Sequence, residues 1–387
     1  MQIEEILTRG VAEVIEKDHL EKALGSGRKL RVKLGIDPTS PNIHIGRAVL
    51  LWKLRAFQEL GHKAVFIVGD FTGLIGDTSD KDAERPMMSE ADVKKNMKTY
   101  FAQAFKILDK NKTETHYNSE WLKNLGFIEM AKMANLFGLH EFESREVVAR
   151  RMKAGKRVSF HELLYPLLQG YDSAAVKADV ELGGTDQRFN LLTGRRIQPL
   201  YGQKPQDIVM MALLEGLDGR KMSSSWGNVV NITDEPSEMF GKIMSLRDEL
   251  IQKYLLLCTQ LPPVEIEMIQ KGLSSPRSLK ARLAREIVTL YHGNKAADLA
   301  EKNFESKFGK TRGEVVPDYT LKKKPGEYEI VSILVEGKLA ASNSEARRKI
   351  AEGAVEVGGT KITDESAKVK LAKGSLVRLG KRFLKIE

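Results

Sequence analysis

Cysteine is almost absent from this sequence, because Cys258 is the single cysteine among 387 residues. One cysteine excludes an internal disulfide framework and a cysteine-based zinc site. The sequence suggests no cysteine–histidine pairing, so a small buried apolar role explains Cys258 better than a nucleophilic one. We therefore expect no resident metal and no chemistry at this thiol.

Long apolar runs and the familiar phosphate loops are also missing. No stretch approaches the ~20 apolar residues that span a bilayer, and residues 1–29 are charged, without the apolar centre of a signal peptide. Neither G-x-G-x-x-G nor G-x-x-x-x-G-K-[ST] occurs at the first strand–helix junction. We expect a cytoplasmic protein with no membrane contact, built from two or three domains.

Acidic residues are fewer than basic ones. The net charge is +10, from 62 basic and 52 acidic side chains. Residues 322–387 hold 15 Lys and Arg against 9 Asp and Glu, so +6 of the +10 lies in the last sixth of the chain. A basic tail favours binding of a polyanion such as nucleic acid. On charge alone, an ordinary solvated surface is an equally good explanation.

What the sequence does contain is a strand–loop–helix–strand unit at residues 30–68. Residues 30–37 alternate like a strand, two prolines mark a loop, and apolar residues follow at helical spacing up to Gly61. This pattern predicts a parallel sheet with a ligand at the carboxyl ends of its strands. Thr39, His44 and Gly46 lie at the helix N-terminus, where backbone N–H groups bind phosphates; alternatively, His44 simply caps a core helix.

Two later segments carry polar residues where a ligand is expected. Residues 69–77 form a glycine-rich stretch after the second strand and end in Asp77; Lys81 and Arg85 follow and could meet phosphates or form a plain charged helix face. In residues 160–172 a tyrosine, a glutamine and an aspartate share one face of an apolar helix, which is unfavourable unless they are hydrogen-bonded. These three residues are Tyr165, Gln169 and Asp172.

Two glycine turns complete the set of candidate sites. Residues 179–187 read as a short strand and a turn ending in Asp186 and Gln187, which suit helix capping or ribose hydroxyls. Residues 216–225 read as a polar loop in which Lys221 precedes three serines. Such a loop is either a flexible anion clamp or a serine-rich linker.

The remaining pattern defines the domains. We expect a helix in residues 1–29, a helical insertion at about 89–157, and an all-helical region after residue 230. The basic run 145–157 fits nucleic-acid phosphates, a subunit interface or a solvated helix face. The predicted domains are 1–230 (α/β), 231–315 (helical), a linker at 316–325, and 326–387 (a small α+β module with a basic helix).

Two motifs together resemble those of class I aminoacyl-tRNA synthetases. Residues 44–47, HIGR, are similar to the HIGH motif, and residues 221–225, KMSSS, are similar to the KMSKS loop. Residues 34–39, 72–77, 165–172 and 183–187 resemble segments of bacterial tyrosyl-tRNA synthetases in particular. The tail resembles the RNA-binding domain of those enzymes, and the resemblance covers essentially the whole chain.

This resemblance implies a Rossmann-like catalytic domain, a helical anticodon domain and a homodimer formed through the insertion. It implies that tyrosine and ATP, with Mg²⁺ on the phosphates, form tyrosyl-adenylate, and that the tyrosyl group passes to the terminal adenosine of tRNA(Tyr). The residues implied at the phosphates and in catalysis are Thr39, His44, Lys81, Arg85, Lys221, Ser224 and Ser225. Those implied for tyrosine are Asp37, Asp77, Tyr165, Gln169, Asp172 and Gln187, and ATP would also contact Gly46, Arg47 and Asp186.

Four positions depart from the family pattern. Arg47 replaces the second histidine of HIGH, Ser224 replaces the second lysine of KMSKS, and Lys33 and Leu34 stand where many members have tyrosine and cysteine. Two other functions stay open: a tryptophan enzyme of the same class, and a non-catalytic RNA-binding protein with a decayed synthetase domain. A buried Asp172 opposes an indole pocket, and retention of the polar set opposes decay.

Overall fold

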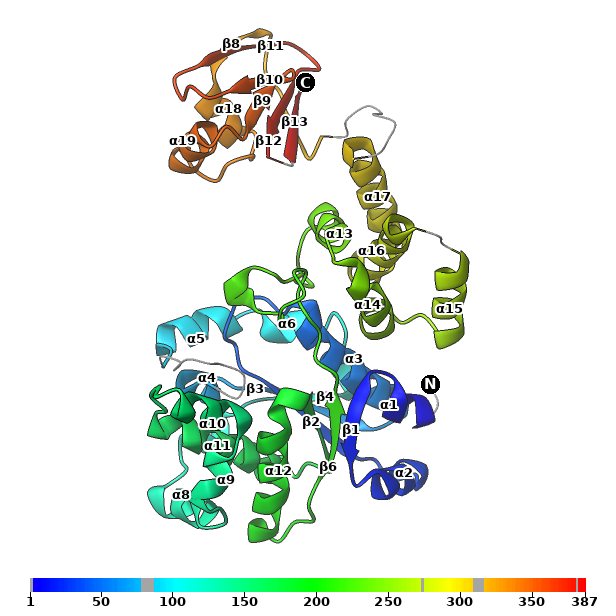
Figure 1. The fold of residues 1–387 in the computed structure, drawn as a ribbon, viewed down its shortest axis with the longest axis vertical. Helices are drawn as coiled ribbons and strands as arrows, with labels where there is room; N and C mark the ends of the chain where they lie inside the picture. The colour runs from blue at the N-terminus through cyan, green and yellow to red at the C-terminus, as the bar shows by residue number, and fades with distance from the viewer. Residues whose placement is uncertain (1–2, 78–86, 273–274, 309–316, 381) are drawn as a thin grey trace. The chain divides into compact units, whose positions relative to one another are not determined.

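The computed structural model describes residues 3–77, 87–272, 275–308, 317–380 and 382–387 (Figure 1). The chain forms two compact units, residues 1–293 and residues 294–387. Within the described residues, no helix combines the length and apolar character needed to cross a membrane.

The first unit is built on a six-stranded sheet in the order β1-β6-β5-β2-β3-β4. All neighbouring strands run parallel except the β1–β6 pair, which is antiparallel. The strands are β1 (Val11–Ile15), β2 (Arg31–Ile36), β3 (Lys63–Val68), β4 (Thr113–Tyr117), β5 (Val180–Gly184) and β6 (Asp207–Met211). The α/β class with a Rossmann-like parallel sheet is therefore confirmed, with one antiparallel edge strand added.

The central strands are apolar because both faces of the sheet are covered. Every residue of β5 and β6 is buried, as are the last five residues of β3, as expected for parallel strands between helices. Helix α3 (Ile45–Glu59) connects β2 to β3 and packs on β2, β3 and β5, while α12 (Arg188–Ile197) packs on β5 and β6. The predicted strand–loop–helix–strand unit is confirmed.

The prediction of one helix in residues 1–29 is wrong. The segment forms α1 (Ile3–Thr8), strand β1 and α2 (Lys17–Gly25). Residues 11–15 include two valines and an isoleucine, whose branched side chains favour a strand, and they pair with β6, where Val11 faces Met211. The helical spacing of the apolar residues was therefore overridden by pairing with a strand about 200 residues away.

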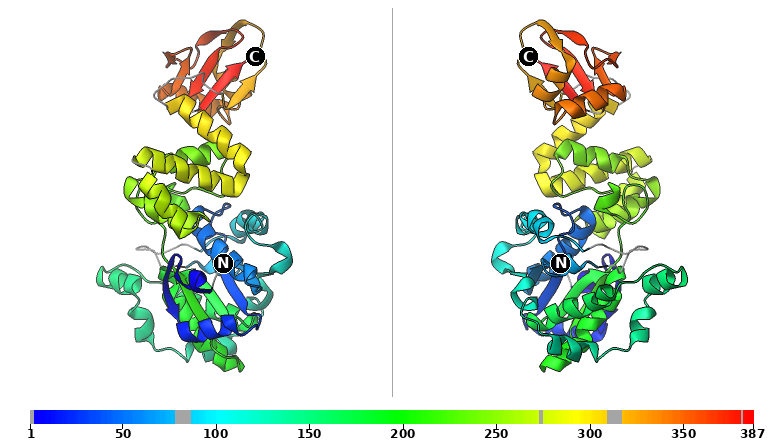
Figure 2. Two further views of the ribbon diagram at one scale, coloured as in Figure 1. Left: turned by 90° about the vertical axis from the view of Figure 1, so that its right-hand side faces the viewer. Right: turned by 90° about the vertical axis from the view of Figure 1, so that its left-hand side faces the viewer.

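The insertion between β3 and β5 is mostly helical, as predicted, and strand β4 interrupts it. Its helices are α4 (Thr72–Ile75), α5 (Glu90–Met97), α6 (Tyr100–Ala104), α7 (Ser119–Leu122), α8 (Phe127–Ala134), α9 (Leu139–Glu143), α10 (Glu146–Lys153) and α11 (Phe160–Ala175). Both views of Figure 2 show the blue-green helices α8 to α10 beside the sheet.

Helix α11 has a strong N-terminal cap. The carboxylate of Glu162 accepts from the backbone N–H of Ser159, which is the capping-box arrangement. The same carboxylate pairs with Arg151 in α10, and both side chains are buried. One long helix is thereby fixed against the insertion and carries Tyr165, Gln169 and Asp172 toward the sheet.

The region after residue 230 is helical, as predicted. In the first unit it contains α13 (Pro236–Met244), α14 (Ile251–Cys258), α15 (Pro263–Gly272) and α16 (Pro276–His292). The buried thiol of Cys258 belongs to this packing, and burial raises its pKa above the ordinary thiol range. A thiol in that environment is a packing group, as expected.

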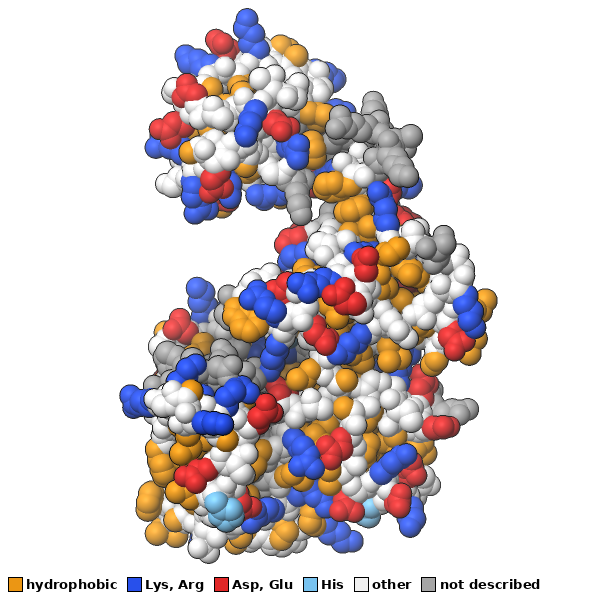
Figure 3. Space-filling model, in the orientation of Figure 1, with side chains coloured by type: hydrophobic (Ala, Val, Ile, Leu, Met, Phe, Trp, Pro, Cys, Tyr) orange, Lys and Arg blue, Asp and Glu red, His pale blue; other side chains and the backbone are white. Residues whose placement is uncertain are grey.

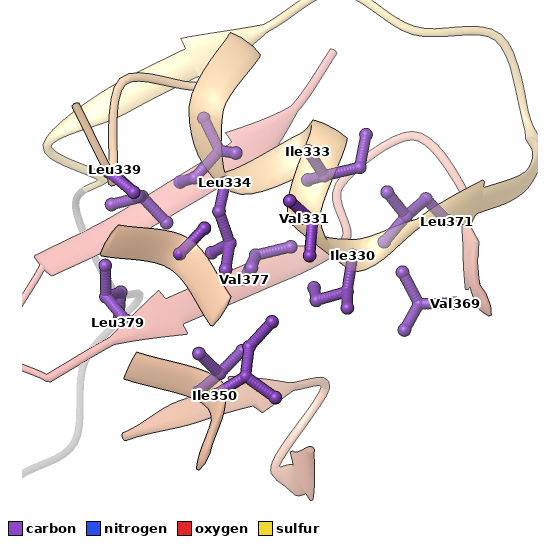
Figure 4. Packing of buried hydrophobic residues seen from close by; sticks show 14 of the residues in the cluster. Ile330, Val331, Ile333, Leu334, Leu339, Ile350, Val369, Leu371, Val377 and Leu379 are labelled. Carbon is purple, nitrogen blue, oxygen red and sulfur yellow. The ribbon is translucent and has the colours of Figure 1, made fainter. Parts of the chain in front are cut away.

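The second unit begins with α17 (Asn294–Phe308) and contains a small α+β module (Figure 4). A sheet in the order β10-β9-β12-β13-β7 and a separate β8–β11 pair enclose apolar side chains such as Ile333, Ile350 and Val377. The elements are β7 (Tyr319–Leu321), β8 (Gly326–Glu329), α18 (Ile330–Glu336), α19 (Asn343–Ala351), β9 (Val355–Val357), β10 (Thr360–Ile362), β11 (Lys368–Leu371), β12 (Leu376–Leu379) and β13 (Arg382–Ile386).

Short-range hydrogen bonds and tight turns shape this module, and one of its strands lies in the predicted linker. The Ser342 hydroxyl caps α19 by accepting from the backbone N–H of Glu345, and the β9–β10 hairpin turns at Gly358 and Gly359, which both have positive φ. Part of the predicted linker, 316–325, forms β7, because Tyr319 to Leu321 pair in parallel with β13.

Candidate active site

Two adjoining pockets open at the carboxyl ends of β2, β5 and β6. The large pocket has a volume of about 350 Å³ and the small pocket, which is the deeper of the two around Asp172, about 80 Å³. Both are lined by Gly35, Ile36, Asp37, Leu50, Tyr165, Gly184 and Gln187. The shared lining means that one ligand can extend from one pocket into the other.

The structure brings nearly all of the predicted site residues to these pockets. The large pocket is also lined by Thr39, His44, Gly46, Arg47, Asp77, Asp186, Lys221 and Ser224. The small pocket is also lined by Gln169 and Asp172. Lys81, Arg85 and the side chain of Ser225 lie outside the described residues.

His44 shapes the large pocket from the N-terminus of α3. Its Nδ1 accepts from the backbone N–H of Arg47 at 3.3 Å, which caps the helix. Burial, together with the cations Arg47 and Lys221, lowers the pKa of His44 to about 3. The imidazole is therefore neutral at pH 7, and it both caps α3 and lines the large pocket.

Glycine at position 46 keeps this corner open. A Cβ there would lie 3.0 Å from the sulfur of Met222 and 3.1 Å from Nδ1 of His44, closer than side chains normally pack. Gly69 serves the neighbouring strand end in the same way, since a Cβ there would collide with the Asp37 carboxylate and the Thr72 hydroxyl. Because neither glycine has a side chain, the surrounding side chains can approach the backbone closely at the carboxyl ends of the strands.

Arg47 holds the loop between β2 and α3. Its Nη2 donates to the Thr39 hydroxyl at 2.8 Å and its Nη1 donates to the Tyr100 hydroxyl at 2.9 Å. Tyr100 in turn donates to the Ser40 carbonyl at 2.7 Å. The replacement of a histidine by arginine at this position thus joins the first loop to α6 and orients Thr39.

The loop after β6 closes over the large pocket through Lys221. Its ammonium donates to the Asp186 carboxylate at 2.9 Å. The loop backbone is fixed by Asn228, which accepts from the Ser223 N–H and donates to the Lys221 carbonyl. The hydroxyl of Ser224 reaches Ser40 in the opposite loop at 3.3 Å, so the two predicted phosphate-binding segments face each other.

Asp172 lies at the end of the small pocket. Its Oδ1 accepts from Trp121 Nε1 at 2.7 Å and its Oδ2 accepts from Asn118 Nδ2 at 3.2 Å. Burial raises the pKa of Asp172 to about 7, although Lys33, Trp121 and Asn118 oppose the shift. This carboxylate is therefore a fixed acceptor whose charge depends on pH near neutrality.

A second group of polar residues joins the two pockets. Tyr165 donates to Oδ2 of Asp37 at 2.9 Å, and Thr72 donates to its Oδ1 at 2.7 Å. Gln187 Nε2 donates to Asp77 at 2.7 Å. Two carboxylates at this junction suit an ammonium ion, whereas His44 and Lys221 at the outer end suit phosphates.

Sequence reasoning missed three polar residues around Asp172. Asn118 and Trp121 follow β4, which was itself not predicted, and Glu181 was read only as part of a strand. No local pattern marks them, because Asn118 and Trp121 depend on β4 lying beside β3, and Glu181 depends on β5 lying beside β2. Among the described residues, no group of three or more His, Cys, Asp or Glu side chains is arranged to hold a metal ion.

Comparison with known proteins agrees with this arrangement. Residues 25–309 match the family model of class I tRNA synthetases of the W and Y type. The chain belongs to this class I tRNA synthetase family. Residues 310–383 match the SYY-like C-terminal domain of tyrosine–tRNA ligases.

Members of the family resemble the chain over nearly its full length. It is 46% identical to a tyrosine–tRNA ligase of Moorella thermoacetica, covering 97% of this chain and 93% of that protein. It is 47% identical to one of Carboxydothermus hydrogenoformans, covering 99% and 97%.

Solved synthetase structures share the fold. A tyrosyl-tRNA synthetase from Archaeoglobus fulgidus, complexed with L-tyrosine, aligns with TM-score 0.61 and 22% identity, over 77% of this chain and 98% of that one. A truncated mitochondrial enzyme from Aspergillus nidulans gives TM-score 0.66 and 22% identity, over 79% and 93%. At this level of identity the likeness concerns the fold alone.

Proposed function

We propose that the protein is a tyrosine–tRNA ligase. In the first step a carboxylate oxygen of tyrosine attacks the α-phosphorus of ATP, and pyrophosphate leaves. In the second step a ribose hydroxyl of the terminal adenosine of tRNA(Tyr) attacks the tyrosyl carbonyl carbon, and AMP leaves. The observation that carries the proposal is the pair of joined pockets, with a fixed acceptor at one end and cationic groups at the other.

The side chains divide between the two substrates. Asp172 accepts from the phenolic hydroxyl, and Asp77, Tyr165 and Gln169 hold the α-ammonium group. Asp37 lies beside that ammonium group, and the amide of Gln187 orients the carboxylate. ATP lies along His44, Gly46 and Thr39, with Asp186 at its ribose and Lys221 with Ser224 at its phosphates. Arg47 acts by holding Thr39, and Mg²⁺ enters with the ATP phosphates.

Catalysis by this arrangement is positioning and charge stabilisation. The substrate carboxylate is itself the nucleophile, so no activated serine or cysteine is required. Negative charge that builds on the leaving pyrophosphate is stabilised by a neutral imidazole N–H and a mobile ammonium. Because these substrates are cytoplasmic, we place the protein in the cytoplasm, which cell fractionation would test.

Amino-acid-dependent exchange of pyrophosphate into ATP tests the proposal. We expect exchange with tyrosine and only weak exchange with tryptophan or phenylalanine. Exchange with tryptophan in place of tyrosine would indicate the tryptophan enzyme of the same family. No exchange with any amino acid would favour a non-catalytic RNA-binding protein.

The basic C-terminal module is proposed to bind tRNA, with residues 231–315 as the anticodon domain. Removing everything after Phe308, so that no part of the β7–β13 sheet remains, should leave adenylate formation within about twofold. Charging of tRNA should fall, and the loss should grow between 50 and 200 mM salt because phosphate contacts release counterions. Equal charging by the full and shortened chains at every salt concentration would contradict tRNA binding by this module.

A homodimer through the insertion is also proposed. Large apolar side chains are exposed on α8 to α11, namely Phe127, Ile128, Leu139, Met152 and Phe160, with Phe127 84% exposed. Figure 3 shows hydrophobic side chains gathered over this part of the surface. Apolar patches of this kind mark interaction sites, and a second copy of the chain is the proposed partner.

Replacing Phe127 and Phe160 with glutamate should convert a dimer to a monomer in sedimentation velocity. Val264→Glu is the matched control, because Val264 is also exposed but lies on α15, outside the patch. A wild-type protein that sediments as a monomer at micromolar concentration would contradict the dimer.

A further inference from the structure

A buried ion pair lies at the floor of the small pocket and has no role in the proposed reaction as described above. Lys33 Nζ on β2 lies 2.8 Å from Glu181 Oε1 on β5, and the two side chains are 0% and 2% exposed. Both residues line the small pocket with Asp172. Lys33 stands at the position where the family resemblance leads one to expect a tyrosine.

Each charge of this pair is fully engaged. Lys33 also donates to the Gln169 carbonyl at 2.9 Å and to the Ser173 hydroxyl at 2.8 Å. Glu181 accepts from Ser173 at 3.0 Å, from Gln169 Nε2 at 3.2 Å and from Gln206 Nε2. With three bonds, the ammonium has no donor left for a ligand, so Lys33 acts through its neighbours.

The neighbours of the pair flank Asp172. Gln169 and Ser173 lie on the turn of α11 that carries Asp172, so the pair fastens this turn to β2 and β5 at once. From Gln169 the contacts continue, because Asn190 Nδ2 donates to Gln169 Oε1 at 3.1 Å and to Gln187 Oε1 at 3.0 Å. Gln187 then donates to Asp77, so one network joins both ends of the amino-acid site.

Stability alone does not explain a charged pair at this place. Replacing a buried ion pair with apolar residues of similar volume is often neutral or stabilising, because burial removes both ions from water. Breaking such a pair at one partner is strongly destabilising, since one charge stays buried alone. An ionic pair at a pocket floor is therefore better explained by its effect on the site.

We propose that Lys33 and Glu181 are positioning residues for amino-acid selection, which set the geometry and the electrostatic field of Asp172 and Gln169. This inference rests on the proposed tyrosine specificity and adds the structural reason for it. The buried ammonium supplies positive charge beside the acceptor of the phenolic hydroxyl, while the hydrogen bonds of the pair fix the helix turn that carries the acceptor.

The charge effect has a definite sign. Asp172 is faced by Lys33 from β2, Glu181 from β5, the donors Asn118 and Trp121 from beyond β4, and Tyr165 on its own helix. Lys33 lowers the pKa of Asp172 more than Glu181 raises it. Removing both charges should therefore raise the pKa of Asp172 above about 7, and the loss of tyrosine affinity on acidification should begin at a higher pH.

The test is the double variant Lys33→Met with Glu181→Gln, which keeps volume and removes both charges. Lys33→Met alone should lower the melting temperature strongly, and the double variant should recover much of that loss. In pyrophosphate exchange, the double variant should lower tyrosine-over-phenylalanine selectivity by about 10-fold or more. The double variant should raise KM for tyrosine and leave KM for ATP within about twofold. The rise of KM for tyrosine at acidic pH should begin at a higher pH than in the wild-type protein.

Lys53→Met is the matched control, because Lys53 is also a buried lysine but donates to the carbonyls of Ile6 and Arg9, and it lines neither pocket. It should lose stability without any change in selectivity. A folded double variant with wild-type selectivity and an unshifted pH limb would overturn the inference and make the pair merely structural.

If the double variant does not fold, a second variant tests the inference. Ser173→Ala removes the hydroxyl that touches both ions and keeps their charges, so it should reduce selectivity with little shift of the pH limb. Unchanged selectivity in that variant would overturn the inference. Absence of tyrosine exchange in the wild-type protein would instead contradict the proposed function itself, so the two failures are distinguishable.

Discussion

Replacing Asp172 with alanine should reduce the preference for tyrosine over phenylalanine by about 100-fold or more, because the phenolic hydroxyl would lose the carboxylate acceptor that Asn118 and Trp121 hold in place. Phenylalanine is rejected by the wild-type site because it leaves this buried carboxylate without a ligand donor. Tyrosyl-tRNA synthetases are themselves the standard example of such rejection, at about 10⁵-fold.

The measurement is kcat/KM for both amino acids in pyrophosphate exchange. Ser119→Ala is a suitable control, since Ser119 lies on the same short helix as Trp121 but outside the two pockets. An active Asp172→Ala variant with wild-type discrimination would disprove the assignment of Asp172 to the hydroxyl.

The same residue predicts a pH dependence. Because burial raises the pKa of Asp172 to about 7, KM for tyrosine should rise as the pH falls below 7 and the acceptor becomes protonated. For the ligand-free fold the sign is opposite: this residue contributes stability below pH 4 that is lost as the pH rises through 7. The rise of KM for tyrosine at acidic pH should be absent from the Asp172→Ala variant, which already lacks the carboxylate.

Replacing Lys221 with alanine should slow adenylate formation by about 100- to 1,000-fold, while the dissociation constant for tyrosine changes by less than about threefold. Lys221 lies in the loop at the outer end of the large pocket, where its ammonium donates to Asp186. It does not line the small pocket, in which the tyrosine side chain is proposed to bind. Its charge therefore acts on the phosphates as the bond to pyrophosphate breaks.

Rapid-quench measurement of adenylate formation, with tyrosine binding measured separately at equilibrium, separates the two effects. Arg220→Ala is the matched control, because this neighbouring cation stacks on Trp226 and pairs with Asp218 and does not line the pockets. A Lys221→Ala variant that forms adenylate at the wild-type rate would rule out the proposed role of the loop.

Local patterns predicted the parts of the site that depend on short stretches of chain. The spacing from Tyr165 to Asp172 placed three polar side chains on one helix face, and the glycine turns before Asp186 and Lys221 placed those residues at strand ends. Parallel strands end at one edge of a sheet, so these separate segments could be expected to meet there, and the two pockets confirm that they do.

What could not be predicted depends on contacts between distant segments. Trp121 and Asn118 reach Asp172 only because β4 adds to the edge beside β3. The pairing of Lys33 with Glu181 depends on β2 and β5 lying side by side, with about 150 residues between them in the sequence. Neither strand adjacency is encoded in a local period or a turn signal.

The antiparallel edge strand β1 has a consequence for synthesis of the protein. Val11 cannot pair with Met211 until about 200 further residues have been made, so the nascent chain carries an unpaired β-branched segment for about half of its translation. Until β6 has been made and pairs with it, this segment can pair with strands of other chains. Pairing of β1 with β6 is therefore a late event in folding, and it ends the interval in which β1 has no partner strand.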